Sequence, residues 1–431
     1  MPKLSELREA AARQYSAGHP EVAVQLYDAI VAAAPLDFEA RTRVADCLLQ
    51  LGDLDAAEPI YRAVHGYALR SGHPLAAVVC ARLLQAHGRD ASGLVEGLVA
   101  TYGQGSGKLG KLAARVASPA PSTEIPAPEL QREPSPAALA QAATRAVHAT
   151  DAFAQWPEAL HPIPLLSELS ESALRRVLDT VLLRRLPSDA LVFRQGDEGS
   201  SFFFVASGEV AITREAGGAT QELARLGENA IFGEMALLTA RPRSATARAV
   251  GEVDLLELGR SSLAALAQNI EGVALALHHF TRDRLLSNVM VSSPLFRALD
   301  SGQRRELLRR FTSHDVTPGA VIIGEGEPGR GLFVVLSGQL EASRCVGDRV
   351  VELGALSIGD VFGEIALLRG GVTTATVTAV EHATVLFLAQ EYVERLLAAI
   401  PELRRCLEEV AASREIDNQL TAGFDEVEVL V

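Results

Sequence analysis

Residues 231–249, IFGEMALLTARPRSATARA, combine residue types that could hold a sugar phosphate. Gly233 permits a backbone turn without a Cβ penalty, and the following EMALL can form one helical turn whose N–H groups point at an anion. Arg243 offers a permanently charged guanidinium whose planar fork matches phosphate oxygens. Glu234 would repel a phosphate, so we expect it to face a donor such as a ribose hydroxyl. Together these residues predict a sugar-phosphate ligand.

This stretch lies in a duplication whose two copies are 130 residues apart. Matching pairs include Pro164 and Pro294, Gly196 and Gly326, Phe203 and Phe333, Gly208 and Gly338, the runs 232–234 and 362–364, and Thr246 and Thr376. No insertion or deletion is needed from Pro164 to Val380. Within each copy, short Val/Phe/Leu-rich runs bounded by glycine and charged turns predict the strands of a jelly-roll or barrel. Each copy then ends in a helical stretch.

The motif of the first copy resembles the phosphate-binding cassette of the cyclic nucleotide-binding domain family. That cassette reads Phe-Gly-Glu-x-Ala-Leu, a short gap, and then Arg-x-Ala-Thr, and residues 232–246 fit it throughout. The resemblance spans roughly residues 161–410. It implies Glu234 on the ribose 2′-hydroxyl, Arg243 on the exocyclic phosphate oxygen, and the backbone of Ala236 with Ser244 completing the phosphate cradle.

The resemblance also implies the ligand and its full set of contacts. The expected ligand-binding residues are Phe232, Gly233, Glu234, Met235, Ala236, Arg243 and Ser244. Ser244 after the arginine is compatible with cAMP, which we favour, and leaves cGMP open. His278, His279 and Thr281 lie on the helix after this copy, where Thr281 could approach the adenine; we interpret the two histidines as partly exposed helix residues. No other cofactor is expected.

The second copy departs from the pattern at the arginine, because the matching position is Thr373. Glu364 is retained, so a buried carboxylate would face the phosphate region without its cation. Losing one partner of a buried charge pair costs roughly 3–5 kcal/mol, or about two to three and a half decades of affinity. We therefore predict that this copy binds cyclic nucleotide very weakly or not at all, with Arg369 as a less favoured substitute cation. The residues of this degenerate site are Gly363, Glu364, Ala366, Thr373 and Thr374.

The first 115 residues show apolar positions at helical spacing and predict antiparallel helices. Gly18, Ala23, Leu26 and Tyr27 recur 34 positions later as Gly52, Ala57, Ile60 and Tyr61. This spacing resembles a tetratricopeptide array, in which each repeat packs on its neighbours; an unrelated helical bundle is the alternative. The later helices, through about Leu112, are expected to cap the stack. Such an array predicts a protein partner docked on residues 1–115.

The remaining segments connect or end these domains. Residues 116–136, rich in Pro, Ala and Ser, predict a flexible linker, and a helix is expected from Ala137 to Trp156, with Trp156 as a packing residue. The resulting boundaries are 1–115 for the repeat, 116–160 for the linker and the helix leading out of it, 161–290 and 291–412 for the two jelly-rolls, and 413–431 for an acidic tail. Its closing FDEVEVLV is expected to fray, and pairing with a partner's sheet edge is the alternative.

Composition narrows the function further. The 431-residue chain has a net charge of −14, which disfavours nucleic acid. Its four cysteines form no CxxC pair, and no apolar run reaches the ~18 residues of a membrane span, so we expect a soluble cytoplasmic protein. No nucleophile and base can be assembled, which argues against an enzyme. The GxGxxG match at residues 105–110 follows helices rather than a strand and is interpreted as flexible chain.

The sequence thus predicts a multidomain α + β protein, with an α-helical repeat followed by two β jelly-roll (double-stranded β-helix) domains, each flanked by helices. We expect a cAMP sensor or adaptor that couples ligand in the first jelly-roll to protein–protein interaction. A constitutive scaffold with vestigial nucleotide sites is the alternative. Tandem sensors also resemble protein-kinase regulatory subunits, but the linker holds no Arg-Arg-x-Ser/Ala pseudosubstrate, and Arg184-Arg185-Leu186-Pro187-Ser188 lies inside the first jelly-roll with the wrong spacing.

Overall fold

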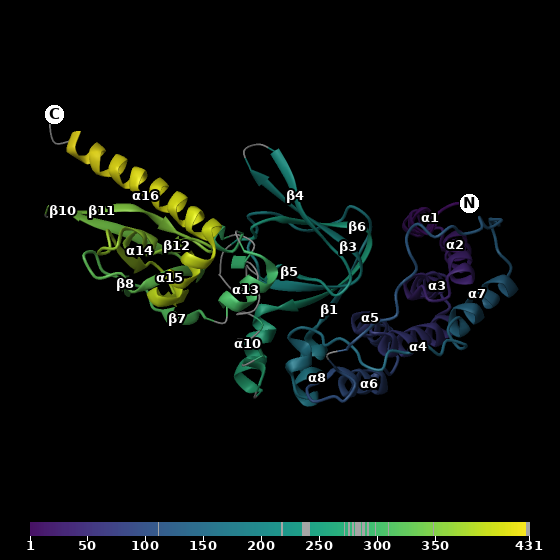
Figure 1. Ribbon diagram of the computed structural model, residues 1–431. Helices are drawn as coiled ribbons and strands as arrows, with labels where there is room; N and C mark the ends of the chain where they lie inside the picture. The colour runs from purple at the N-terminus through teal and green to yellow at the C-terminus, as the bar shows by residue number, and fades with distance from the viewer. Residues whose placement is uncertain are drawn as a thin grey trace. The chain divides into compact units, whose positions relative to one another are not determined.

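The computed structural model divides into two compact units, Met1–His279 and Phe280–Val431. It describes all residues except 111, 217–218, 235–241, 271, 275, 278–279, 281–285, 287–288, 291–292, 298, 309, 348 and 428–431. Within the described residues, helices come first and antiparallel sheets follow in each unit (Figure 1). The predicted fold class is confirmed.

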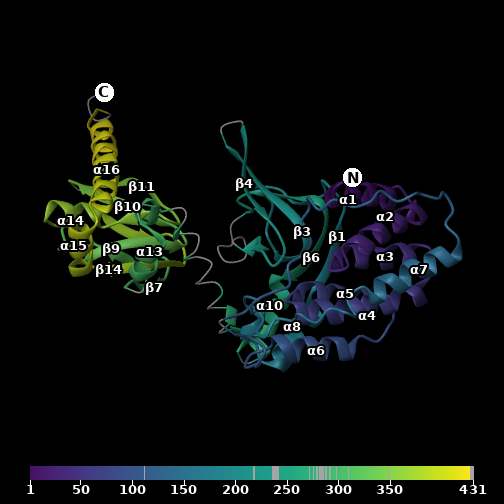
Figure 2. The ribbon, with the colours of Figure 1, turned by 45° about the vertical axis from the view of Figure 1, so that its right-hand side comes forward.

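The first unit opens with paired antiparallel helices that lie beside the first jelly-roll (Figures 1 and 2). They are α1 (Leu4–Ser16), α2 (Pro20–Ala33), α3 (Phe38–Gln50), α4 (Leu54–Ser71), α5 (Pro74–Ala86) and α6 (Ser92–Tyr102). Gly18 and Gly52 have φ values of 81° and 87° in equivalent turns, a conformation that glycine adopts without strain. Because α6 ends at Tyr102, the expectation that capping helices reach Leu112 is wrong.

The segment after α6 does not behave as a flexible linker. The carbonyls of Pro121 and Thr123 accept hydrogen bonds from the backbone N–H groups of Ser5 and Leu4, at 3.1 and 2.8 Å. These are among the N–H groups that a helix N-terminus leaves without an intrahelical partner, so the segment caps α1. Ile125 is fully buried. Composition alone could not reveal this, since the stabilising partners are distant in sequence.

Two neighbouring expectations are corrected for the same reason. The 105–110 stretch is paired rather than free, because Leu160 donates its N–H to the Lys108 carbonyl at 2.8 Å. The helix α7 (Pro136–His148) stops well before Trp156. The buried Arg41 guanidinium donates to the carbonyls of Ala146 and Val147 at 2.8 and 3.2 Å, which satisfies the last turn of α7.

Trp156 packs beyond the end of α7, against the helical array. Its ring centroid lies 5.8 Å from that of Tyr67, and the Arg70 guanidinium carbon lies 4.2 Å from the indole centroid. These contacts support its interpretation as a packing residue.

The first jelly-roll follows a short 3-10 turn, η1 (Leu166–Glu168), and helix α8 (Glu171–Thr180). Its strands are β1 (Leu182–Leu186), β2 (Leu191–Phe193), β3 (Ser201–Ala216), β4 (Ala219–Leu226), β5 (Ile231–Phe232) and β6 (Thr246–Gly259), and helix α10 (Arg260–Asn269) continues the chain. All pairings are antiparallel in the order β1-β6-β3-β4, with β2 on β6 and β5 on β3. The inward side chains of β3, β5 and β6 form one apolar core.

The helical array and this jelly-roll are joined by a ring of four charges. Arg43 and Asp46 come from α3, Arg185 from β1 and Asp254 from β6. The ring closes through N···O distances of 3.2 Å for Arg43–Asp46, 2.6 Å for Asp46–Arg185, 3.0 Å for Arg185–Asp254 and 3.2 Å for Asp254–Arg43. The two charges of each sign balance, so burial leaves no uncompensated ion. We call these four residues the charge quartet.

Two tyrosines of the repeat donate hydrogen bonds to carboxylates at this interface, and the neighbouring arginines lower the pKa of one carboxylate. Tyr61 donates to Asp46 at 2.6 Å, and Tyr27 donates to Glu252 of β6 at 2.7 Å. Burial acts to raise the pKa of Asp254, but Arg185 and Arg43 outweigh it and lower that pKa to about 2. A depressed folded-state pKa means that this stabilisation is complete at neutral pH and is lost as the pH falls through that value.

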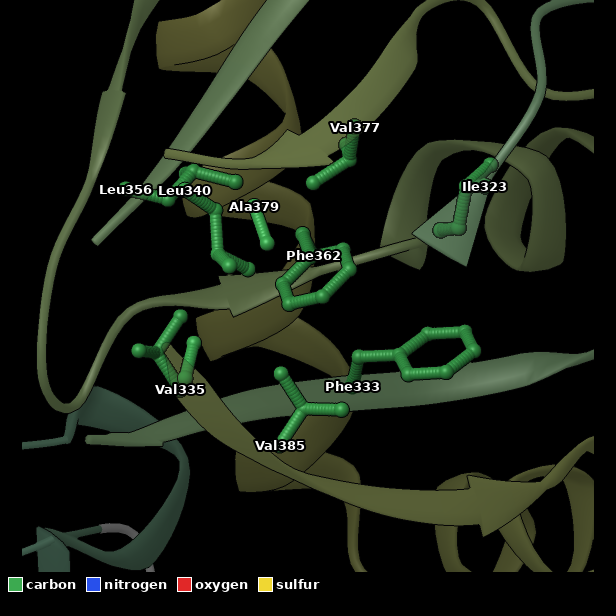
Figure 3. Close-up of a cluster of buried hydrophobic side chains, with 10 residues drawn as sticks. Ile323, Phe333, Val335, Leu340, Leu356, Phe362, Val377, Ala379 and Val385 are labelled. Carbon is green, nitrogen blue, oxygen red and sulfur yellow. The ribbon is translucent and has the colours of Figure 1, made fainter. Parts of the chain in front are cut away.

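The second unit repeats the jelly-roll. Helices α12 (Pro294–Arg297) and α13 (Ser301–Leu308) precede β7 (Thr312–Val316), β8 (Val321–Ile323), β9 (Gly331–Ser337), β10 (Leu340–Val346), β11 (Arg349–Leu356), β12 (Val361–Phe362), α14 (Glu364–Arg369), β13 (Thr376–Ala379), β14 (Ala383–Ala389), α15 (Gln390–Ala399) and α16 (Pro401–Val427). Two four-stranded sheets, β11-β10-β13-β8 and β12-β9-β14-β7, enclose an apolar core (Figure 3). Because α16 continues to Val427, residues 413–427 are helical. This contradicts the predicted fraying for residues 424–427, while 428–431 lie outside the described residues.

A matched pair of arginines tests the charge quartet. We expect Arg185→Ala to lower the free energy of unfolding of the first unit by about 3 kcal/mol, because two buried aspartates lose a cation. Urea unfolding can be followed by the fluorescence of Trp156, the only tryptophan of the chain. Arg225→Ala is the control, since its pairs with Glu209 and Glu222 are exposed; equal unfolding midpoints for the two variants would contradict the assignment.

Candidate functional site

Arg243 is held inside the first jelly-roll. Its side chain is buried, Nη1 donates to the Gly233 carbonyl at 2.5 Å and Nη2 donates to the Ser201 carbonyl at 2.7 Å. Its guanidinium carbon lies 4.2 Å from the centroid of the Phe193 ring. Burial lowers the pKa of Arg243, but an arginine remains protonated at any physiological pH. The site therefore contains a fixed positive charge largely withdrawn from water.

The backbone around Arg243 is fixed by two reciprocal hydrogen bonds. Gly196 donates its N–H to the Arg243 carbonyl and Arg243 donates its own to the Asp197 carbonyl, each at 2.8 Å. Opposite, Gly233 has a φ of 80°, and a Cβ placed on it would lie 2.8 Å from Arg243 Nη1. The cassette therefore needs glycine at this position both for its backbone angle and for the space that the guanidinium fills.

The structure brings the described cassette residues together at the end of β5. Phe232 packs its ring on Phe203 with 5.2 Å between centroids, and Glu234 is buried near the Arg243 charge. Ser244 is exposed beside the arginine, and its carbonyl accepts a hydrogen bond from Arg214 at 3.4 Å. Met235 and Ala236 lie outside the described residues, as do His278, His279 and Thr281.

The second copy keeps the backbone framework and replaces the cation. Gly326 donates to the Thr373 carbonyl at 2.9 Å and Thr373 donates to the Glu327 carbonyl at 2.8 Å, the same two bonds at the 130-residue offset. The Thr373 hydroxyl donates to the Gly324 carbonyl at 2.5 Å and accepts from the Glu327 N–H at 3.0 Å. The threonine hydroxyl thus both donates and accepts a hydrogen bond within the adjacent loop. Thr374 and Ala366 border the same region as Gly363 and Glu364.

The buried carboxylate of the second copy nevertheless has a cation, which corrects the sequence expectation. Glu364 is 1% exposed, and its Oε1 lies 3.0 Å from Nη1 of Arg414 on α16. Arg414 also donates to the Val361 carbonyl. Burial raises the pKa of Glu364 and Arg414 opposes that rise. Arg369 is not the substitute, because it pairs with Glu415 at 2.8 Å.

A cavity of about 80 Å³ lies beside this pair. Its lining includes apolar side chains of β11, β12 and β13 together with Glu364 and Arg414. Helix α16 therefore borders the cavity beside the second copy's equivalent of the cassette, and Arg414 pairs with Glu364, which lines it.

The described residues also bear on metal binding and on membrane crossing. No group of three or more His, Cys, Asp or Glu among them could hold a metal ion. No helix among them has both the length and the apolar character needed to cross a membrane.

Sequence reasoning missed Arg414 and the environment of Arg243. In the sequence, Arg414 is a basic residue within the otherwise acidic segment 413–431. The opposite sign of its charge is the only sequence feature that could have indicated its role. Phe193 opens the stretch Phe-Arg-Gln-Gly-Asp, which resembles a strand-turn signature of the family, and Ser201 belongs to no motif. Neither is linked to Arg243 by sequence spacing; they approach it because β2 and β3 pair with β6 in the folded jelly-roll.

The chain thus consists of a helical repeat followed by two jelly-rolls, and the first jelly-roll buries an arginine and a glutamate near each other. The model of the cyclic nucleotide-binding domain matches residues 183–269 and 313–399, and the tetratricopeptide repeat model matches residues 14–66. The chain therefore contains two cyclic nucleotide-binding domains preceded by a tetratricopeptide repeat, as predicted.

Curated relatives that match more than half of the chain include cAMP-dependent protein kinase regulatory subunits. The cAMP-dependent protein kinase regulatory subunit of Yarrowia lipolytica is 31% identical over 236 residues, covering 55% of this chain and 59% of that subunit. The type II regulatory subunit of Drosophila melanogaster is 25% identical over 249 residues, covering 58% of this chain and 63% of that subunit. The solved regulatory domain of Toxoplasma gondii PKA with cAMP is 26% identical, covers 58% of this chain and 92% of that chain, and has a TM-score of 0.29. The chain thus matches about three fifths of the length of these curated relatives.

The ion pair of the second copy can be tested by removal and rescue. Arg414→Ala leaves Glu364 buried without its cation, so we expect the free energy of unfolding of the second unit to fall by about 3–5 kcal/mol. Hydrogen–deuterium exchange of β12 and α14 should accelerate, and adding Glu364→Gln should restore much of the protection. Arg369→Ala, which breaks only an exposed pair, is the control. Unchanged exchange in Arg414→Ala would show that the contact contributes nothing.

Proposed function

We propose that the chain is a non-catalytic cAMP sensor in which the first jelly-roll binds the ligand. The observation that carries this proposal is the buried Arg243, positioned by the carbonyls of Gly233 and Ser201 next to Glu234. A buried guanidinium provides charge-assisted hydrogen bonds to a phosphate, and a glutamate can accept from ribose hydroxyls. The kinship with cAMP-dependent regulatory subunits supports cAMP as the ligand, with cGMP as the competitor to be tested.

In this proposal the second jelly-roll has no cyclic-nucleotide site. Thr373 offers a phosphate no charge, and Arg414 already neutralises Glu364. The second copy then acts as a lever or interface.

A contact route leads from the ligand site of the first jelly-roll to the helical repeat. Helix α10 follows β6 directly and packs on α8, and α8 packs on α6 of the repeat. Arg82 of α5 also donates to the carbonyls of Leu178 and Val181 at the end of α8, at 2.6 and 2.7 Å. We propose that ligand binding shifts α10 and that α8 transmits the shift.

A protein partner on residues 1–115 belongs to the same proposal, with a restricted surface. Helix α5 packs on β3 and β6 of the first jelly-roll, and Arg43 of α3 pairs with Asp254 of β6, so the partner would dock on the helical surface that remains. We also propose a reducing, cytoplasmic setting, in which the buried Cys47 and Cys80 remain free thiols.

The scaffold alternative is favoured by one observation. The charge quartet joins the repeat to the first jelly-roll through protein side chains alone, which suits a constitutive assembly. Ligand binding and its structural effect separate the two functions.

Calorimetric titration of the full chain with cAMP and cGMP tests the sensor. We expect one site, and Arg243→Ala to lower cAMP affinity by about 30-fold to 4,000-fold, because truncating one partner of a desolvated charge pair costs about 2–5 kcal/mol. Thr373→Ala, at the matching position of the second copy, is the control and should bind as the wild type does. No binding to the wild type would leave the scaffold as the better function, and full binding to Arg243→Ala would remove the assigned site.

Hydrogen–deuterium exchange with and without saturating cAMP tests the proposed route. We expect exchange in α10 (Arg260–Asn269) to change, with a smaller change in α8, because both lie between the ligand site and the repeat. Helix α1, which packs on α2 and accepts its N-terminal cap from residues 121–123, serves as the internal control. If cAMP binds and the exchange of α10 stays the same, the effect of the ligand is not transmitted through this helix.

A further inference from the structure

The geometry points to Phe193 as the positioning residue for Arg243: its ring forms an aromatic shelf that orients the guanidinium toward the phosphate, and this shelf distinguishes the binding copy from the silent one. The inference rests on the proposed function and adds a determinant that the cassette motif does not contain. Phe193 ends β2, fifty residues before the arginine in sequence.

The ring is placed where it can act on the cation. The Arg243 guanidinium carbon lies 4.2 Å from its centroid, within the ~6 Å range of a cation–π contact. Such a contact is strongest where water is excluded, and Arg243 is 6% exposed. The two carbonyl contacts, from Gly233 and Ser201, restrain Nη1 and Nη2, and the ring restrains the face of the guanidinium plane.

The ring is itself immobilised by the core. Its centroid lies 5.9 Å from that of Phe203 and 5.9 Å from that of Phe232. Its chain is tied to the arginine as well, since Gly196, three residues later, donates to the Arg243 carbonyl. A Cβ on Gly233 would lie 2.8 Å from the guanidinium and 3.3 Å from the Phe193 ring, so this glycine leaves room for both groups.

The second copy provides an internal comparison. At the 130-residue offset Phe193 becomes Ile323 and Arg243 becomes Thr373, while Phe333 and Phe362 keep the remaining rings. Figure 3 shows Ile323 beside the same two phenylalanines, where it fills the core without offering a π face. The shelf and the cation it would hold are therefore both absent from this copy.

The equivalent space in the second copy is a small cavity, lined by Ile323, Gly331, Phe333, Gly363 and Thr373. A Cβ on Gly363 would lie 3.5 Å from the Ile323 side chain, which matches the place of Phe193 relative to Gly233. However, the nearest atom to that Cβ is the Gly331 carbonyl oxygen, at 2.8 Å, where the first copy has Arg243 Nη1. Strand backbone therefore lies nearest this glycine in the second copy, at the distance that the cation has in the first.

A double-mutant cycle on the full chain tests the shelf. We expect Phe193→Leu to weaken cAMP binding about five- to 25-fold, the equivalent of a desolvated cation–π contact, and to leave binding of adenosine, which has no phosphate, unchanged. Phe193→Tyr keeps the π face and should stay within about threefold of the wild type. In an Arg243→Ala background, titrated to millimolar cAMP, Phe193→Leu should have no further effect.

The outcomes separate this inference from the proposed function. Phe193→Leu with wild-type cAMP affinity, an equal loss for adenosine, or the same loss in the Arg243→Ala background would overturn the shelf and leave the sensor standing. Absence of cAMP binding by the wild type would overturn the sensor, and the shelf with it. Ile323→Leu in the second copy is the matched packing control and should change neither affinity.

Discussion

A charge taken out of water must find its counter-charge or a set of hydrogen-bond partners within the protein, and this constraint organises both units of the chain. In the first unit it closes the ring of Arg43, Asp46, Arg185 and Asp254. In the second unit it joins Glu364 to Arg414. In the first jelly-roll the Arg243 guanidinium donates to two backbone carbonyls and lies against an aromatic ring.

The two jelly-rolls show how one framework separates into two roles. Backbone hydrogen bonds around Arg243 and Thr373 are the same, and the stacked phenylalanine pairs have centroid distances of 5.2 and 5.0 Å. What differs is the identity of a few side chains inside that framework. A retained glutamate without a phosphate-binding arginine would be a destabilising residue, and α16 removes this penalty by bringing its own arginine. The second copy thus has an intramolecular ion pair at its retained glutamate.

Much of this architecture was predictable, because it follows from regularities along the chain. The 130-residue offset predicted two equal jelly-rolls, the 34-residue offset predicted the repeat, and the cassette predicted Gly233, Glu234 and Arg243. In the sequence, Arg185 belongs to a basic run with the wrong spacing for a pseudosubstrate, and Ile125 lies in a Pro-, Ala- and Ser-rich segment that predicts a flexible linker. Both acquire their roles from partners more than a hundred residues away, and pairing at that distance is decided by the folded topology rather than by local sequence pattern.

The charge quartet also sets an order of events during synthesis. Arg43 and Asp254 are 211 residues apart, and at translation rates of about 5–20 residues per second the second emerges roughly 10–40 s after the first. During that interval the helices of the nascent repeat carry a charged face whose cis partners have not yet been made. The repeat can therefore reach its final state only after the whole first jelly-roll has left the ribosome, so the two mature together although they look like separate modules in the sequence.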